Sequence, residues 1–483
     1  MEIVENKAPR KFGMRDKLAY AMGDFGCNMS FSLNSYLQTF YMMYIKLDVN
    51  IIAAIILILK IWDGINDPIM GAIMDVVKPG KRGKFKTWIF YGSFLLLFSG
   101  ALCFVDTANA KTWVQVLVFF IGYLVWDFSY TLVNVPYGSL NSAITADQTE
   151  RAQLSTWRSI GSIVANVGAM VAIPMIIYTK ELDAAGNEIQ VMLGGRMFWI
   201  ALIMGIIGFI AFQILNKFTI ERVKSEPKVS DGEVEKVNYF KALKAFFNNR
   251  PAVALTVAAM LSLIMQGGLG AASAVLYTSY FVEGENSGII TMLGMIPMFG
   301  VIPLVKPLVK KFGNKAICVW SLPIGIIGSI LMMVVPLPKG MTGMFIWAIF
   351  SMIVALGYAM FGMVGWAMVA DCIDYQELQT GVRTEGIVYA TYSLGRKLAQ
   401  GFGASLVLVL LGLIGYVSAD GANQSYQVAC NTKVLIGAIY GACMVLMFVV
   451  LNYWYNIGKK EAQEMQTKLG RVNDSYAAPE GVE

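Results

Sequence analysis

The stretch "IIAAIILILKIWDGINDPIMG", residues 51–71, decides how the chain must be interpreted. It opens with an unbroken apolar run at 51–59 and continues through Asp63 and Asp67 without a turn signal. An apolar segment of about 20 residues is long enough to cross the hydrocarbon core of a bilayer as a helix. The stretch therefore predicts a membrane-spanning helix that carries two carboxylates where charge is costly.

The rest of the chain has the same character. Of its 483 residues, 57% are hydrophobic and 14% are charged. We count about twelve apolar segments of spanning length, and lipid offers the backbone no partners, so each must be a helix. The first segment runs from near Leu18 past Tyr41, which is too long for a signal peptide. We expect an all-α, multi-pass membrane protein.

The positive residues indicate an orientation. Lys and Arg outnumber Asp and Glu by 38 to 32, and most of them fall in loops on one side if the N-terminus lies inside. By the positive-inside rule, both termini are expected in the cytoplasm and the protein in the cell (inner or plasma) membrane. Basic residues in separate short loops argue against nucleic-acid binding. The chain has no histidine and no nucleophile motif, so we expect neither an enzyme nor a cofactor.

One long polar stretch, residues 217–250, divides the chain. It separates an N-terminal six-helix half, 1–216, from a C-terminal half, 251–457, which a polar tail, 458–483, follows. Two six-helix halves joined by a long loop indicate the major facilitator fold, whose halves are pseudo-repeats. We expect it to work as a monomer.

The carboxylates of the opening stretch lie on one helical face with an amide. Asp63, Asn66 and Asp67 are spaced by three, four and one, which places them together on a helix. A mid-membrane acid costs about 2.5–3.5 kcal/mol, so such residues usually have a function. Two adjacent carboxylates repel, and a bound monovalent cation relieves the repulsion with oxygen ligands that suit a hard ion. The alternative is an internal ion pair with Lys397, and both hold if Lys397 pairs with the acids only when the cation is absent.

Other expected helices also carry polar side chains at helical spacing. The members of this set are Asp24, Asn28, Asp127, Thr131, Asn134 and Arg158. So many donors and acceptors suit a hydroxylated solute such as a sugar, which also needs an aromatic ring to stack on. Trp126 is one candidate for that ring, although an interfacial position explains a single aromatic residue more simply.

Five segments together resemble the glycoside–pentoside–hexuronide:cation symporter family over nearly the whole chain. They are "KIWDGINDPIMG" at 60–71, "RGKFKTWI" at 82–89, "YTLVNVPYGSL" at 130–140, "MVADCIDYQE" at 368–377 and "VRTEGIVYA" at 382–390. The resemblance implies a major facilitator fold that works by alternating access, with a sugar or glycoside entering together with Na⁺, Li⁺ or H⁺.

The resemblance also implies roles for individual residues. The family's cation site matches Asp63, Asn66, Asp67 and Thr131. Arg158 and Lys397 match charged positions of its sugar permeases, and Asp371 and Arg383 match a charge pair that gates the inner side. The candidates for substrate binding are then Asp24, Asn28, Trp126, Asp127, Asn134, Arg158 and Lys397.

The chain departs from the family's galactoside carrier at two of these positions. Asn28 and Asn134 stand where that carrier has aspartates, so galactoside specificity is not carried over. Asp24 and Asp127 lie one or two turns away on the same faces, where they either read hydroxyl groups or tune the pocket. The loss of two acids favours a glucuronide or another acidic sugar, whereas Asp24 and Asp127 argue against one.

Other function classes remain open at this point. An uncoupled sugar facilitator would not need Asp63 and Asp67, and a lysolipid carrier of the same fold would not need so polar a pocket. A receptor would leave the buried acids unexplained. The same carboxylates can serve Na⁺ or H⁺; we expect a symporter that imports a sugar, glycoside or oligosaccharide with Na⁺ as its coupling ion, with H⁺ or Li⁺ as the alternatives.

Overall fold

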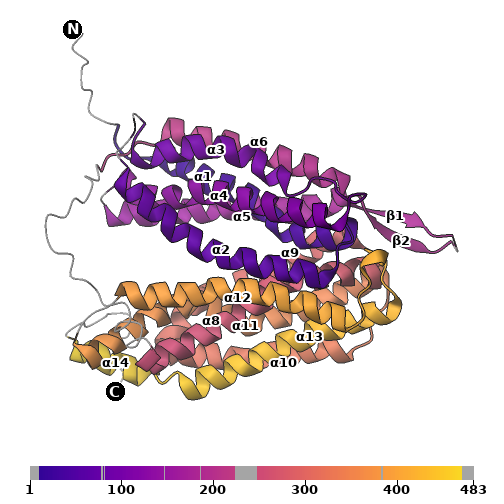
Figure 1. Ribbon diagram of the computed structural model, residues 1–483. Coiled ribbons are helices and arrows are strands. Elements are labelled where there is room, and N and C mark those ends of the chain that lie inside the picture. Colours follow the sequence, from indigo (N-terminus) through magenta and orange to yellow (C-terminus); the bar gives the residue numbers. More distant parts are fainter. Residues whose placement is uncertain are drawn as a thin grey trace, which may run out of the picture. The chain divides into compact units, whose positions relative to one another are not determined.

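The computed structural model describes residues 10–77, 80, 82–145, 147–184, 186–223, 247–381 and 385–469. The chain forms two compact units, one made of residues 1–181, 191–231 and 418–422, and the other of 182–190, 232–417 and 423–483. Both are built from long helices (Figure 1). We call them unit 1 and unit 2.

Each unit contains six long helices among the residues that the structure describes. Those of unit 1 are α1 (Met14–Thr39), α2 (Val49–Val76), α3 (Lys84–Leu102), α4 (Thr112–Ile144), α5 (Gln148–Ile177) and α6 (Gly195–Phe218). Those of unit 2 are α8 (Arg250–Val275), α9 (Ser287–Phe312), α10 (Asn314–Val334), α11 (Gly340–Thr380), α12 (Glu385–Leu413) and α13 (Tyr426–Val449), followed by the short polar α14 (Lys459–Lys468). Between α5 and α6 the chain pairs two strands, β1 (Tyr178–Leu182) and β2 (Glu188–Met192), which the sequence did not predict.

Eleven helices in the described part of the chain are long and apolar enough to span a membrane. α1 is not among them because polar side chains lower its hydropathy, but its 26 residues give it a length of about 39 Å, enough to cross. With α1, the described residues contain twelve helices of spanning length, in agreement with the prediction.

The two units repeat one another. In unit 1, α1 packs on α5 and α6, α3 packs on α4 and α6, and α2 packs on α4. The corresponding helices of unit 2 pair in the same way: α8 packs on α12 and α13, α10 on α11 and α13, and α9 on α11. The first helix of each unit ends in one π-helical turn, Phe40–Tyr44 or Leu276–Tyr280. Two residues after each turn, Lys46 and Val282 adopt left-handed backbone angles, φ 62° and 58°. Two halves with the same helix pairing and the same rare backbone turn confirm the predicted pseudo-repeat.

Glycines let the paired helices approach closely. A Cβ atom on Gly161 of α5 would lie 2.2 Å from the backbone oxygen of Ala21 on α1. At the matching crossing in unit 2, a Cβ on Gly268 of α8 would lie 2.4 Å from the oxygen of Gly403 on α12. Small residues at helix crossings are the usual route to tight packing in membranes, where no hydrophobic effect pulls helices together.

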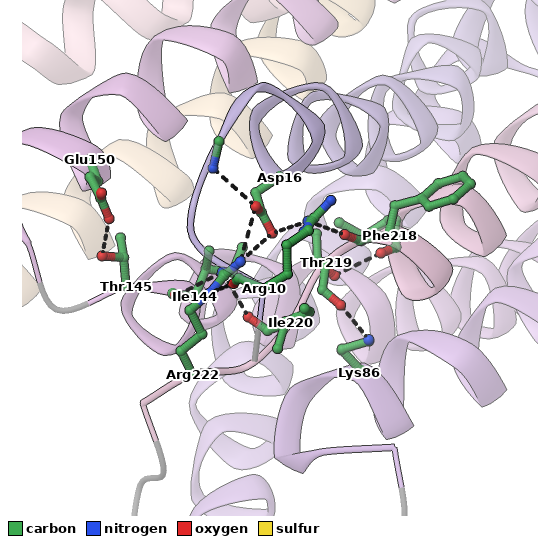
Figure 2. Close-up of polar contacts among 12 residues, drawn as sticks. Arg10, Asp16, Lys86, Ile144, Thr145, Glu150, Phe218, Thr219, Ile220 and Arg222 are labelled. Carbon is green, nitrogen blue, oxygen red and sulfur yellow. Dashed lines mark hydrogen bonds and ion pairs between the residues drawn. The ribbon is translucent and has the colours of Figure 1, made fainter. Parts of the chain in front are cut away.

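The segment after α6 ties four helices of unit 1 together at one end (Figure 2). Asp16, fully buried at the start of α1, accepts hydrogen bonds from Arg222 at 3.1 Å and forms an ion pair with Arg10 at 2.8 Å. The Arg222 backbone N–H donates to the oxygen of Ala143 on α4. Glu221 accepts the first backbone N–H groups of α3, from Lys84 and the two residues after it, at 2.8–3.0 Å. These groups would otherwise be unsatisfied at a helix start.

Candidate functional site

Polar side chains from α2 and α4 meet in the interior of unit 1. We call this set the α2–α4 cluster, and its members are Lys60, Asp63, Asn66 and Asp67 on α2 with Tyr123, Asp127 and Thr131 on α4. On each helix the members recur every three or four residues, so they project from one face. Because α2 packs on α4, the two polar faces satisfy each other instead of facing lipid.

Asn66 is at the centre of this cluster. Its amide nitrogen donates to Oδ2 of Asp127 at 2.9 Å and to Oγ1 of Thr131 at 3.1 Å. The hydroxyl of Thr131 donates in turn to Oδ1 of Asp67 at 3.1 Å. Asn66, Asp127 and Thr131 are 4%, 6% and 2% exposed. The chain of hydrogen bonds therefore runs from one carboxylate to another through an amide and a hydroxyl in a buried position.

Asp63 lies one turn earlier and has different partners. Its Oδ2 accepts from the Lys60 ammonium at 2.7 Å and from the Tyr123 hydroxyl at 3.1 Å, and Lys60 also donates to Tyr123 at 2.7 Å. Its other oxygen, Oδ1, is buried and has no hydrogen-bond partner among the residues described. A buried polar atom without a partner costs about 1–3 kcal/mol, more when charged.

The donor types of the α2–α4 cluster are those that bind hard cations. Nowhere in the described part of the chain do three His, Cys, Asp or Glu side chains gather as they would around a transition metal. Carboxylate, amide and hydroxyl oxygens instead suit hard cations with oxygen coordination. The cluster can offer oxygens from Asp63, Asn66, Asp67 and Thr131.

A second polar set joins α1 to α5, and we call it the α1–α5 cluster. Its members are Asp24, Asn28 and Ser32 on α1 with Arg158, Ser162 and Asn166 on α5. Arg158 Nε donates to Asp24 at 2.9 Å, and the Asn166 amide donates to Asn28 Oδ1 at 2.8 Å. Gly161 faces the backbone of Ala21, three residues before Asp24, and its missing side chain allows α5 to come this close to α1.

Arg158 retains hydrogen-bonding capacity beyond Asp24. Only its Nε is engaged; the two terminal nitrogens donate to none of the residues that the structure describes. The guanidinium lies 5.1 Å from the ring centre of Tyr137, and the side chain is 39% exposed. A planar guanidinium with a free end can bind a carboxylate or a pair of hydroxyl groups in a fork.

Tyr130 of α4 lies between the two clusters. It is close enough to interact electrostatically with Asp24 and Arg158 of one cluster and with Asp67 of the other. Its ring stacks on Trp126, with the ring centres 5.6 Å apart. Tyr130 is therefore a neighbour of both clusters.

The remaining predicted residues lie elsewhere. Trp126 is buried, and its indole N–H donates to Ser30 at 2.8 Å, so it packs α4 against α1; its role in substrate binding stays a prediction. Asn134 is half-buried on α4, with no hydrogen bond to another described residue. Lys397 is half-buried on α12 of unit 2. Asp371 on α11 accepts from Asn314 at 3.3 Å, whereas Arg383 lies outside the described residues.

The structure regroups one predicted residue and adds several. Asp127, expected near the substrate, contacts Asn66 and lies in the α2–α4 cluster. Lys60, Tyr123, Ser162 and Asn166 were not predicted. Their spacing was the available signal, since Lys60 precedes Asp63 by three residues and Ser162 and Asn166 follow Arg158 at intervals of four.

A known family model, described as MFS/sugar transport protein, matches residues 19–459. The chain belongs to this family. It is 27% identical to an uncharacterised symporter of Bacillus subtilis, YjmB, with 96% of this chain and 97% of the relative covered. It is 25% identical to a glucuronide carrier protein homolog of Escherichia coli, with 95% and 96% covered.

Solved structures agree on the fold. The nucleoside transporter NupG superposes with a TM-score of 0.62 over 90% of this chain and 100% of that one, at 14% identity. The protein is therefore a multi-pass membrane protein of the major facilitator fold, and its family transports sugars by symport.

Proposed function

We propose that this protein is a Na⁺-coupled symporter that imports a sugar or glycoside across the cell membrane by alternating access, with both termini in the cytoplasm. The ion site is the α2–α4 cluster, with Asp63, Asn66, Asp67 and Thr131 as ligands. The substrate site is the α1–α5 cluster together with Asn134. We also propose that Lys397 takes part in substrate binding and that Asp371 and Arg383 form a gating pair, because these residues match charged positions of the family.

The main support for the ion site is that Oδ1 of Asp63 is buried and has no hydrogen-bond partner among the described residues. Lys60 and Tyr123 both engage Oδ2, so the internal ion pair leaves the other carboxylate oxygen buried and unsatisfied. Asn66 Oδ1 likewise accepts no hydrogen bond from a described residue. A buried carboxylate oxygen without a donor, one turn from an amide oxygen that accepts no hydrogen bond from a described residue, is what a small cation would satisfy.

Arg158 favours an acidic sugar as the substrate. Its terminal nitrogens are free while its Nε is held by Asp24, so the fork is oriented before substrate arrives. A hexuronide offers a carboxylate that such a fork binds better than hydroxyl groups alone. The similarity to a glucuronide carrier homolog supports the same choice.

Uptake into proteoliposomes tests the proposal. Purified protein would be reconstituted and given labelled glucuronides and neutral glycosides, with an inward gradient of Na⁺, of Li⁺, of H⁺ or of K⁺ as the control. We expect accumulation of a glucuronide above its equilibrium level under the Na⁺ gradient. Accumulation under a pH gradient alone would show that the coupling ion is H⁺ and not Na⁺. Equilibration without accumulation under every gradient would make the protein a facilitator, contrary to the proposal.

A further inference from the structure

We infer that Asp127 is a positioning residue for the coupling ion, and that it holds the Asn66 amide so that Oδ1 of Asn66 is presented to the ion. This inference rests on the proposed function, because it concerns the same ion site. Sequence reasoning expected Asp127 to contact substrate.

The hydrogen bonds of Asn66 specify the orientation of its amide. A side-chain amide has one nitrogen with two donors and one oxygen that only accepts. Both donors are used, one by Asp127 on α4 and one by Thr131 a turn further along the same helix. The oxygen must then point away from both acceptors. A rotated amide would place this oxygen against the Asp127 carboxylate, where two acceptors repel.

Asp127 is the closer of the two partners of the Asn66 amide, at 2.9 Å against 3.1 Å for Thr131. Both side chains are at least nine-tenths buried, so water does not compete. Thr131 must also serve Asp67, to which its hydroxyl donates.

Asp127 itself makes no contact that a substrate role requires. Asp127 accepts a hydrogen bond from Asn66, and the charged groups close to it, Asp63 within hydrogen-bonding range and Lys60, also belong to the α2–α4 cluster. Groups that orient a metal ligand without touching the ion typically contribute 10–100-fold to affinity. We expect Asp127 to contribute at the lower end of that range, since Thr131 also holds the amide.

The test is the Na⁺ dependence of thermal unfolding of the purified full-length protein in detergent. A ligand that binds only the folded state raises the unfolding temperature with its concentration. NaCl would be varied at constant ionic strength with choline chloride, for the parent, Asp127→Ala, Asp127→Asn and the control Ser129→Ala. Ser129 is buried on the same helix, and among the described residues its hydroxyl donates to Val125 alone.

For Asp127→Ala we expect the NaCl concentration at half-maximal stabilisation to rise about tenfold. Asp127→Asn keeps an acceptor for the Asn66 amide and should shift that midpoint by no more than about threefold. Ser129→Ala should leave it in place. A merely structural role would lower the unfolding temperature at every NaCl concentration without moving the midpoint.

Three results would overturn the inference in distinguishable ways. An unmoved midpoint in Asp127→Ala would show that Asp127 does not act on the ion. Equal large shifts in the Ala and Asn variants would show that its charge matters and the orientation of Asn66 does not. A parent that Na⁺ stabilises no more than choline would reject the proposed Na⁺ site itself.

Discussion

The ammonium nitrogen of Lys60 lies 2.7 Å from Oδ2 of Asp63, one turn away on α2. Both side chains are 18% exposed, so the pair is largely shielded from solvent. The pair was not expected, although Lys60 is the first residue of the motif that suggested the ion site. It supplies a local partner for Oδ2 and leaves Oδ1 without a hydrogen-bond donor among the described residues.

The first prediction concerns Lys60. Lys60→Gln removes the ammonium group that pairs with Asp63. Removing one partner of a buried ion pair is costly because the other charge stays buried. We expect a lower unfolding temperature than the parent without Na⁺, and most of the loss recovered in saturating Na⁺. Thermal unfolding in choline chloride and in NaCl measures this. The same loss in both salts would mean that Na⁺ does not approach Asp63.

The second prediction concerns Asp67. Asp67→Asn should abolish gradient-driven accumulation, because an ion ligand loses its charge, while the protein still folds and inserts. Uptake in proteoliposomes under a Na⁺ gradient measures accumulation, and size-exclusion chromatography in detergent checks the fold. Asp48→Asn is a control at the start of α2, where the side chain caps the helix by accepting from the Asn50 backbone N–H. Full accumulation by Asp67→Asn would remove this residue from the ion site.

The third prediction concerns Arg158. Arg158→Lys keeps the positive charge but loses the fork, so affinity for a glucuronide should fall about tenfold or more. Na⁺ affinity should change less, because no α2–α4 cluster residue is altered. Calorimetric titration with a glucuronide in saturating Na⁺ gives the affinity. Parent-like binding by the Lys variant would show that charge alone is recognised, and parent-like binding by Arg158→Ala would place the substrate elsewhere.

The fourth prediction concerns the fully buried Asp16. Asp16→Asn leaves Arg10 and Arg222 without an anion, although both guanidiniums keep partial access to solvent. We expect a loss of roughly 2–3 kcal/mol, below the 3–5 kcal/mol typical of fully buried pairs. Arg10→Gln should cost less, since Arg222 remains and Arg10 is 34% exposed. Chemical unfolding of the purified protein compares the two, and an equal loss would mean that Arg10 dominates the network.

The fifth prediction concerns Val282, whose left-handed backbone is strained for a β-branched residue. Left-handed backbone angles cost a non-glycine residue about 1–2 kcal/mol, which Val282→Gly would relieve. Glycine also gives the unfolded chain more conformational entropy, which opposes part of this gain, so we expect a net stabilisation of unit 2 by up to about 1 kcal/mol. Val282→Ala, which keeps a Cβ, is the matched control. If the Gly variant unfolds at a lower temperature than the Ala variant, the turn is not strained.

Much of the fold was predictable because its determinants are local. Lipid forces a long apolar segment into a helix, so most of the helices can be predicted from hydropathy. α1 is the exception, because its polar residues keep its hydropathy below that of the other spans. The paired strands β1 and β2 were missed because they lie in the loop between α5 and α6, where hydropathy says nothing. The repeat was predicted from the segment count, whereas its matching turns at Lys46 and Val282 are visible only in the backbone.

Of the candidate site, the sequence by itself determined which residues share a helical face, because residues three and four apart always do. It thereby determined the sets Asp63–Asn66–Asp67, Asp24–Asn28 and Asp127–Thr131–Asn134. Only the tertiary structure decided which faces meet. Asp127 turned out to contact Asn66, and Arg158 to contact Asp24, because α4 packs on α2 and Gly161 lets α5 approach α1. Helix periodicity is a property of neighbouring residues, but the choice of partner helix depends on close packing between residues far apart in the chain.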